Sequence, residues 1–293
     1  MKNFSPIKLS AILLAFSFLL LPSSSSALST TYLDPGYTAS AFHTLDFDSR
    51  VIEFDSSGNL YTANIANDFS GTNTIYKLDA VSGFTTSSVY ASYSTTACCM
   101  TGFHFTPSGD LLISNSMTGG DAGVIDLVQA GTLAQSTFKD ISDFRPTGIS
   151  ADTAGDVYVT GRLSSVPGFG NIYKINNGDG SIDILVNNFV GKGIAVDAGG
   201  NIFASNAADN SIWRFAAGTF ASSIVASFDS TPGELTFDEF GNLYALGSGS
   251  VAGTTDIVRL SPNAVPEPGT MMLLGTGLVA LIAVRKRFLR LHG

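Results

Sequence analysis

The chain has 293 residues, of which 44% are hydrophobic and 13% charged, and it contains 31 glycines. It is long enough to bury a large core, but it is poor in the charged residues that cover surface helices, which favours strands and turns. Residues 28–264 hold nine basic and 23 acidic side chains, a net charge of −14 that excludes nucleic acid as a partner of the body.

The first 27 residues predict a signal peptide. Lys2 and Lys8 form a positive first part, residues 9–21 are apolar, and small residues precede Leu28. A first core helix is the alternative, which Pro22 and the serines after it disfavour. Export would place the body in an oxidising compartment.

The body, residues 28–264, repeats one pattern five times. In each repeat an apolar strand precedes a turn of the type D-x-x-G-N, and a second strand runs back. The turn glycines recur at spacings of 51, 46, 45 and 41 residues: Gly58, Gly109, Gly155, Gly200 and Gly241. Periods of about 40 to 50 residues with strand composition predict the blades of an all-β propeller.

Further strands complete the blades. A third strand follows each repeat, at 74–79, 123–128, 171–176, 211–216 and 256–261. A fourth follows only the first four repeats, at 85–93, 136–142, 181–187 and 222–228. A matching strand lies instead before the first repeat, at 36–45, so we predict a five-bladed ring closed by N-terminal strand pairing in the last blade. Six blades, one of them degenerate, are the alternative.

The repeat itself resembles known propellers. The pattern D-x-x-G-N-[LI]-[YF]-x-[AT]-[NS], as in Asp55 to Asn64 and Asp197 to Asn206, is similar to the repeats of the NHL, YVTN and gluconolactonase/regucalcin-like families. The resemblance implies the fold, whereas an activity has to be argued from a site.

The end of the channel at which the inner strands begin is the predicted ligand rim. In propellers of this kind the first strand of each blade lines the channel and starts where the second strand ends. The strand starts are Arg50, Thr101, Thr147 and Lys192. The gluconolactonase resemblance implies a divalent cation on the axis of the channel. In this sequence the oxygen ligands, which would suit Ca²⁺, would be Glu234, Asn64, Asn115 and Asn206. Alternatively the asparagines cap turns, and the cations Arg50 and Lys192 argue against a metal.

No catalytic residue is assigned from the sequence. The body has His43 and His104, and the latter is interpreted as a structural histidine of an inner strand. The sequence has no nucleophile elbow, zinc-protease or Walker motif. Asp55, Asp152, Asp197 and Asp238 recur at one position before the turn, which indicates turn chemistry.

Two further side-chain groups leave alternatives open. Cys98 and Cys99 are candidates for a vicinal disulfide, and the alternatives are two reduced thiols or bonds to a partner. The aromatic residues at strand positions fit packing between blades. Sugar binding by loop members such as Phe69 or Phe169 is the alternative.

Residues 265–293 predict a sorting signal. A turn of Val265, Pro266, Glu267 and Pro268 precedes the uncharged residues 270–284, a short transmembrane helix, and then the basic stop Arg285, Lys286 and Arg287. This order resembles the PEP-CTERM sorting signal of Gram-negative bacteria. The resemblance implies an exosortase-type processing protease, transient anchoring in the inner membrane and removal of the tail. An uncut single-pass anchor is the alternative.

The resemblances together predict an exported, surface-sorted β-propeller that binds or scaffolds, associated with the extracellular polysaccharide or biofilm layer. The partner would be a cell-surface polysaccharide or protein. The alternative is a metal-dependent, lactonase-like hydrolase with Ca²⁺ on the propeller axis. A purely structural repeat protein would bind neither metal nor small ligand.

Overall fold

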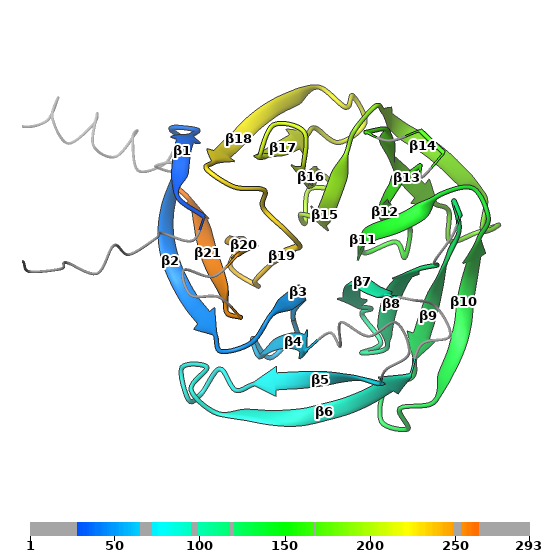
Figure 1. Cartoon of the computed structure of the whole chain (residues 1–293), viewed down its shortest axis with the longest axis horizontal. Coiled ribbons are helices and arrows are strands. Elements are labelled where there is room, and N and C mark those ends of the chain that lie inside the picture. Colours follow the sequence, from blue (N-terminus) through cyan, green and yellow to red (C-terminus); the bar gives the residue numbers. More distant parts are fainter. Residues whose placement is uncertain are drawn as a thin grey trace, which may run out of the picture.

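The computed structural model describes residues 28–64, 72–94, 99–117, 120–163, 165–166, 168–248 and 253–263. The predicted signal peptide, the sorting signal and its transmembrane segment lie outside these residues. Within them the protein forms 21 strands in five sheets placed radially around one axis (Figure 1). No helix in this described part is long and apolar enough to cross a membrane.

The first three blades each have four strands, which follow one another from the axis outward. The first blade is β3 (Ser49–Phe54), β4 (Leu60–Asn64), β5 (Thr72–Leu78) and β6 (Ser87–Ser94). The second is β7 (Cys99–Phe105), β8 (Leu111–Ser116), β9 (Gly123–Val128) and β10 (Gln135–Ile141). The third is β11 (Arg145–Ala151), β12 (Val157–Arg162), β13 (Gly170–Ile175) and β14 (Ile182–Asn187).

The last two blades take up the N-terminal strands. The fourth blade is β15 (Gly191–Val196), β16 (Ile202–Asn206), β17 (Ser211–Phe215), β18 (Ser222–Phe228) and, outermost, β1 (Thr30–Leu33). The fifth is β19 (Leu235–Phe237), β20 (Leu243–Ser248), β21 (Thr255–Pro262) and β2 (Tyr37–Leu45).

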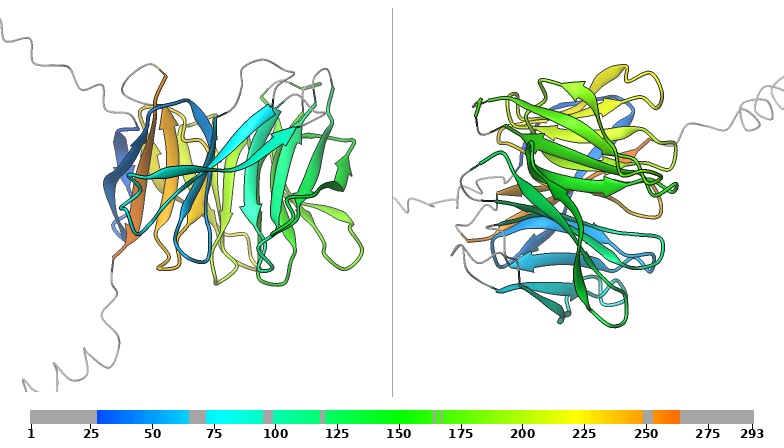
Figure 2. Two further views of the ribbon diagram at one scale, coloured as in Figure 1. Left: turned by 90° about the horizontal axis from the view of Figure 1, so that it is seen from below. Right: turned by 90° about the vertical axis from the view of Figure 1, so that its right-hand side faces the viewer.

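The pairing of β2 with β21 closes the ring, as predicted. It runs antiparallel from Tyr37 opposite Pro262 to Leu45 opposite Thr255. The prediction of five blades is therefore confirmed, and the six-blade alternative is wrong. Figure 2 shows β2 lying against the C-terminal strand β21 at one side of the ring.

The strand β1 was not predicted. It pairs with β18, so the N-terminal segment extends the fourth blade before it turns into the fifth. A four-residue strand with two exposed side chains gives no periodic signal. Because one short segment pairs with two neighbouring blades, it fastens them together where the ring closes.

The D-x-x-G-N turns owe their shape to local hydrogen bonds. The carboxylate of Asp197 accepts from the N–H groups of Gly199 and Asn201, and Asn201 Oδ1 accepts from Ala217 N. All five turn glycines have φ between 76° and 85°, a region that L-residues with a side chain rarely adopt. The second blade departs from the pattern because Thr106 stands where the other blades have Asp.

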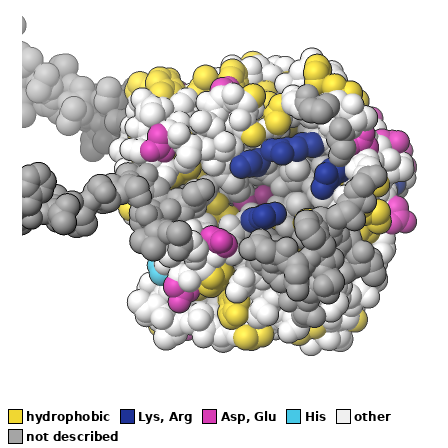
Figure 3. Space-filling model, in the orientation of Figure 1, with side chains coloured by type: hydrophobic (Ala, Val, Ile, Leu, Met, Phe, Trp, Pro, Cys, Tyr) yellow, Lys and Arg dark blue, Asp and Glu magenta, His cyan; other side chains and the backbone are white. Residues whose placement is uncertain are grey.

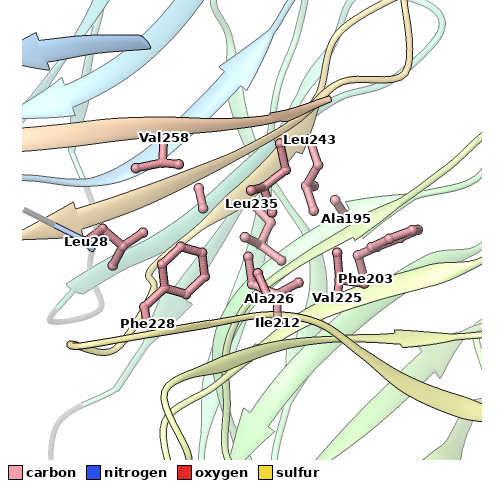
Figure 4. Close-up of a cluster of buried hydrophobic side chains, with 12 residues drawn as sticks. Leu28, Ala195, Phe203, Ile212, Val225, Ala226, Phe228, Leu235, Leu243 and Val258 are labelled. Carbon is pink, nitrogen blue, oxygen red and sulfur yellow. The ribbon is translucent and has the colours of Figure 1, made fainter. Parts of the chain in front are cut away.

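Hydrophobic clusters fill the spaces between neighbouring blades. The cluster between the fourth and fifth blades includes Leu28, Phe203, Phe228, Leu235 and Val258 (Figure 4). Leu28 is only 3% exposed, so the first described residue already belongs to the core. Removing such side chains from water is the main stabilising term of the fold.

The inner strands pack backbone against backbone around the axis. A Cβ added to Gly148 would lie 2.7 Å from the carbonyl oxygen of Lys192, and one on Gly193 would lie 2.4 Å from that of Gly233. Glycine is therefore required at these positions in β11 and β15. The same position in the fifth blade is Glu234, just before β19. The carboxyl group of Glu234 reaches the inner strands of the third and fourth blades, where the backbone N–H groups of Ile149 and Ile194 influence its pKa.

Candidate ligand-binding site at the mouth of the axial channel

The two ends of the axial channel are built differently. At one end the inner strands start and the second strands finish, as shown by the pairs Ser49 with Asn64 and Gly191 with Asn206. We call this end the mouth. The opposite end carries the D-x-x-G-N turns, and we call it the turn end. The predicted ligand rim corresponds to the mouth.

Four basic side chains meet at the mouth and form what we call the basic cluster: Arg50, Arg145, Arg162 and Lys192. Arg145 and Arg162 are directly opposite each other in the β11–β12 pair. Burial is the largest cause that lowers the pKa of Lys192. The guanidinium groups of Arg162 and Arg50 lie close enough to lower it further. Burial and Arg145 lower the pKa of Arg162. Figure 3 shows Lys and Arg side chains gathered around the central hollow of this face.

Three members of the basic cluster have no carboxylate partner in the part of the chain that the structure describes. Within the described ranges Arg50, Arg162 and Lys192 form no salt bridge. The buried Nε of Arg162 has no hydrogen-bond partner there either. Basic groups that approach one another without an acidic partner repel, and in a protein as acidic as this one such an arrangement is uncommon. The mouth is thus a site of concentrated positive charge.

The two threonines of the predicted rim connect blades instead of facing a ligand. The Thr101 hydroxyl lies 3.1 Å from the carbonyl oxygen of Ser114 and 3.0 Å from that of Pro146 in the next blade. The Thr147 hydroxyl repeats this contact with Thr160 (3.0 Å) and with Gly191 of the fourth blade (2.9 Å). Their hydrogen-bonding capacity is used in holding adjacent inner strands together.

Glu234 lies inside the channel below the mouth, with only 2% of its surface exposed. Its pKa is raised well above the usual value, chiefly by burial and then by the charge of Glu53. The backbone N–H groups of Ile149 and Ile194 act in the opposite direction, but neither makes a hydrogen bond of normal geometry, and both carboxyl oxygens have no partner in the described part of the chain. As pH rises, Glu234 therefore keeps its proton longer than an exposed glutamate does.

The three asparagines of the predicted Ca²⁺ site do not join Glu234. Asn115 donates to the Tyr93 hydroxyl (2.7 Å) and to Asp126 (3.1 Å), between the first and second blades. The side-chain oxygen of Asn206 accepts from Ala208 N, which is the turn-capping role, and Asn64 is exposed at the end of β4. Among the described residues no three His, Cys, Asp or Glu side chains lie close enough to hold a metal ion. Of the predicted oxygen ligands, Asn206 Oδ1 is already occupied, whereas both carboxyl oxygens of Glu234 and the buried Oδ1 of Asn115 have no partner among the described residues.

A polar layer crosses the axis between Glu234 and the turn end. Glu53 Oε1 lies 2.8 Å from His104 Nδ1, and Glu53 Oε2 accepts from the Thr236 hydroxyl at 2.7 Å. These residues come from β3, β7 and β19, so the layer links three blades. The interpretation of His104 as a structural histidine agrees with this pairing.

The turn end holds a cavity of about 540 Å³ between the first, second and third blades. Its lining includes Tyr61, Tyr90, Phe105, Asp55 and His104. Both acidic groups of this lining already accept hydrogen bonds: Asp55 from Asn59 and the Tyr61 hydroxyl, and Asp152 from the Tyr158 hydroxyl. The cavity was not predicted, because its walls are the repeated turns, whose residues have structural roles.

Two sequence predictions concern residues that the structure describes only in part. Cys99, at the start of β7, is disulfide-bonded, whereas Cys98 lies outside the described residues, so the vicinal bond stays a prediction. Phe69 is likewise outside the described residues. Phe169, on the loop that leads into β13, is 47% exposed.

Arg145 and Arg162 were missed in the sequence, although a signal for them exists. The prediction placed the strand start of the third blade at Thr147 and the second-strand end at Gly161. The structure extends β11 back to Arg145 and β12 on to Arg162. Strand boundaries are the least reliable part of a sequence pattern, and a shift of one or two residues would have added both arginines to the rim.

Comparisons with known proteins separate the tail from the body. The PEP-CTERM protein-sorting motif matches residues 264–287. No curated protein matches the sequence of the chain.

Solved structures match the body. A nidogen/laminin complex has 14% identity and a TM-score of 0.52, with 69% of this chain and 73% of that chain covered. A gluconolactonase from Xanthomonas campestris has 12% identity, a TM-score of 0.50 and coverage of 81% and 95%. A putative gluconolactonase has 15% identity, a TM-score of 0.50 and coverage of 80% and 98%. Identities this low show a shared fold and no more. The protein is a five-bladed β-propeller that shares its fold with these gluconolactonase structures, and it carries a PEP-CTERM sorting motif, the mark of an exported protein of the Gram-negative cell envelope.

Proposed function

We propose that the protein is a surface-sorted binding or scaffolding module of the extracellular polysaccharide layer. The observation that supports this proposal is that the propeller precedes the sorting signal along the chain. The closing strand β21 ends at Pro262, and the sorting motif begins at residue 264. Every strand of the ring therefore precedes the motif, so cleavage within the motif by an exosortase-type protease would release a complete propeller.

The proposal is tested by following the protein in the cells that make it. The full chain is compared with a variant that lacks residues 264–293, and both are detected in the membrane, polysaccharide and medium fractions. We expect the full chain in the polysaccharide fraction at a mass that lacks both ends, and the variant to be lost to the medium. Equal distribution of the two would contradict sorting by the motif, and a full-length mass would indicate an uncut anchor.

A Ca²⁺-dependent, lactonase-like hydrolase is the second candidate, and one observation favours it. Both carboxyl oxygens of Glu234 lie buried on the axis without a hydrogen-bond partner among the described residues. A bound cation would supply the missing partner and act as a Lewis acid. Against it stand the raised pKa of Glu234 and the side-chain oxygen of Asn206, which already accepts from Ala208 N.

Calorimetry with Ca²⁺, and lactone hydrolysis with and without EDTA, separate the two functions. The binding module predicts no heat of Ca²⁺ binding and no hydrolysis that EDTA removes. A hydrolysis that is lost both in EDTA and in Glu234→Gln would establish the enzyme instead.

A further inference from the structure

We propose that the basic cluster at the mouth binds a carboxylated polysaccharide, with several uronate groups held at once by Arg50, Arg145, Arg162 and Lys192. The inference rests on the proposed function, because it names the ligand of that binding module. The site itself is defined by the structure, through the convergence of basic side chains from three blades.

The unpaired charge at the mouth is the first reason to expect an anion. Lys192 is half-buried, and the charged groups that perturb it are the two arginines Arg162 and Arg50. Desolvation and mutual repulsion both cost stability in the free protein. A bound anion would relieve both, since it brings opposite charge and new hydrogen bonds to the buried donors. A site that is unfavourable when empty is the usual sign of a binding function.

The width of the basic cluster argues for a ligand with several anionic groups. Arg50 belongs to the first blade, Arg145 and Arg162 to the third, and Lys192 to the fourth. One carboxylate carries a single negative charge and would leave most of the positive charge of this set unmatched. The planar guanidinium group matches the two oxygens of a carboxylate in a bidentate pair, and the basic cluster has three such groups.

The charge of the remaining surface argues for a polymer of moderate charge density. The body carries −14, so most of its surface repels polyanions. Duplex nucleic acid has one charge per about 1.7 Å of its axis and would meet this repulsion along its whole length. A polysaccharide with one carboxylate per sugar ring carries less charge and can reach the mouth with a short segment.

An exposed aromatic side chain beside the basic cluster favours a sugar over a free anion. Leu163 N donates to the carbonyl oxygen of Phe169 at 3.1 Å, which places Phe169 on the loop that continues directly from Arg162. Almost half of its side chain is exposed. Aromatic rings provide large contact areas at little entropic cost, and the C–H faces of sugar rings pack on them. Cations with a neighbouring aromatic surface suit an acidic sugar.

The test measures binding to the exported protein by calorimetry. The probes are oligogalacturonate, its methyl ester of the same length, free galacturonate and a single-stranded DNA oligomer. We expect oligogalacturonate to bind, with an affinity that falls as salt is raised, and the other three to bind at least about tenfold more weakly, or about 1.4 kcal/mol.

Variants connect that binding to the mouth. Arg162→Gln with Lys192→Gln should weaken oligogalacturonate binding by at least about tenfold, and Phe169→Ala should weaken it without changing the salt dependence. Arg50→Gln, at an exposed position, should also weaken it and serves if the double variant fails to fold. Lys77→Gln is the matched control, because it removes one positive charge from β5 beside Tyr61, which lines the turn-end cavity. It should bind like the parent protein.

Four outcomes would overturn the proposal. Equal binding of the ester would remove the need for carboxylates, and equal binding of free galacturonate would reduce the site to one for small anions. Tighter binding of DNA would make nucleic acid the partner. Unchanged binding in the folded mouth variants would move the site elsewhere. None of these affects sorting to the surface, so failure here is distinguishable from failure of the proposed function.

Discussion

The same strands form the mouth and the turn end of the channel. The charged groups at the turn end have hydrogen-bond partners, whereas basic groups at the mouth have no acidic partner in the described residues. At the turn end Asp197 accepts two backbone N–H groups, and deeper in the channel Glu53 is paired with His104 and Thr236. At the mouth Arg162 and Lys192 have no acidic partner in the described residues.

This difference separates what builds the propeller from what the propeller is used for. The turn residues repeat because every blade needs the same hydrogen bonds to reverse its chain. The residue at the strand start differs between blades, being basic in the first and fourth and threonine in the second and third, and the charges placed there cost stability. Side chains that vary from blade to blade and oppose folding are better candidates for function than those that recur.

The largest loss of stability is expected where the inner strands of neighbouring blades pack most closely against each other. Gly193→Ala places a Cβ 2.4 Å from the Gly233 carbonyl oxygen and 2.5 Å from Glu234 Cα, and both are backbone atoms that cannot rotate away. We expect the free energy of unfolding to fall by about 3 kcal/mol or more, at the upper end of overpacking effects. Urea unfolding measures it. Gly178→Ala is the control, since nothing lies within 4 Å of its added Cβ, and equal stability of the two variants would contradict the packing described.

Glu234 gives the next largest effect, and it depends on pH. Burial and Glu53 raise its pKa in the folded protein, so the folded state binds this proton more tightly than the unfolded state. Stability is therefore highest below the pKa of the unfolded chain, about 4.3, and is lost as pH rises from there towards the folded pKa. Glu234→Gln removes this loss, so the variant should gain on the parent protein by about 1.4 kcal/mol per pH unit within that window.

Urea unfolding at several pH values between 4 and 8, in EDTA, measures this gain. Exposed Glu239→Gln is the control and should not change the pH dependence. If Glu234→Gln instead loses stability at neutral pH when Ca²⁺ is present, an ionised carboxylate with a bound cation is indicated, and the hydrolase becomes the better candidate.

A smaller loss is expected in the polar layer. Glu53→Gln keeps the shape but removes the charge that accepts from both His104 Nδ1 and the Thr236 hydroxyl, and it turns an amide donor towards one of them. A buried group left with a wrong partner costs about 1–3 kcal/mol. Thermal unfolding checks this, and a change as small as that in Glu239→Gln would show that the layer contributes little.

The same contrast explains how much of the structure could be predicted from the sequence. The number of blades and the closing strand followed from a repeat whose turns are fixed by local hydrogen bonds, which a sequence displays directly. The basic cluster follows from side chains brought together by closure of the ring, and Arg145 and Arg162 lay just beyond the predicted strand ends. The burial of Glu234 depends on the inner strands of two other blades, since the backbone of Ile149 and of Ile194 lies beside its carboxyl group. No local pattern reports it.

The smallest effect tests whether the mouth is under repulsion in the free protein. Lys192→Gln removes one of the like charges that Arg162 and Arg50 oppose, so at low salt it should raise the free energy of unfolding by up to about 0.5 kcal/mol. The gain should shrink as salt screens the remaining charges over distances of about 10 Å or less. Lys77→Gln, on the acidic remainder of the surface, should show no gain. A clear loss of stability in Lys192→Gln would mean that Lys192 has an attractive partner, and the contrast between the mouth and the turn end would then disappear.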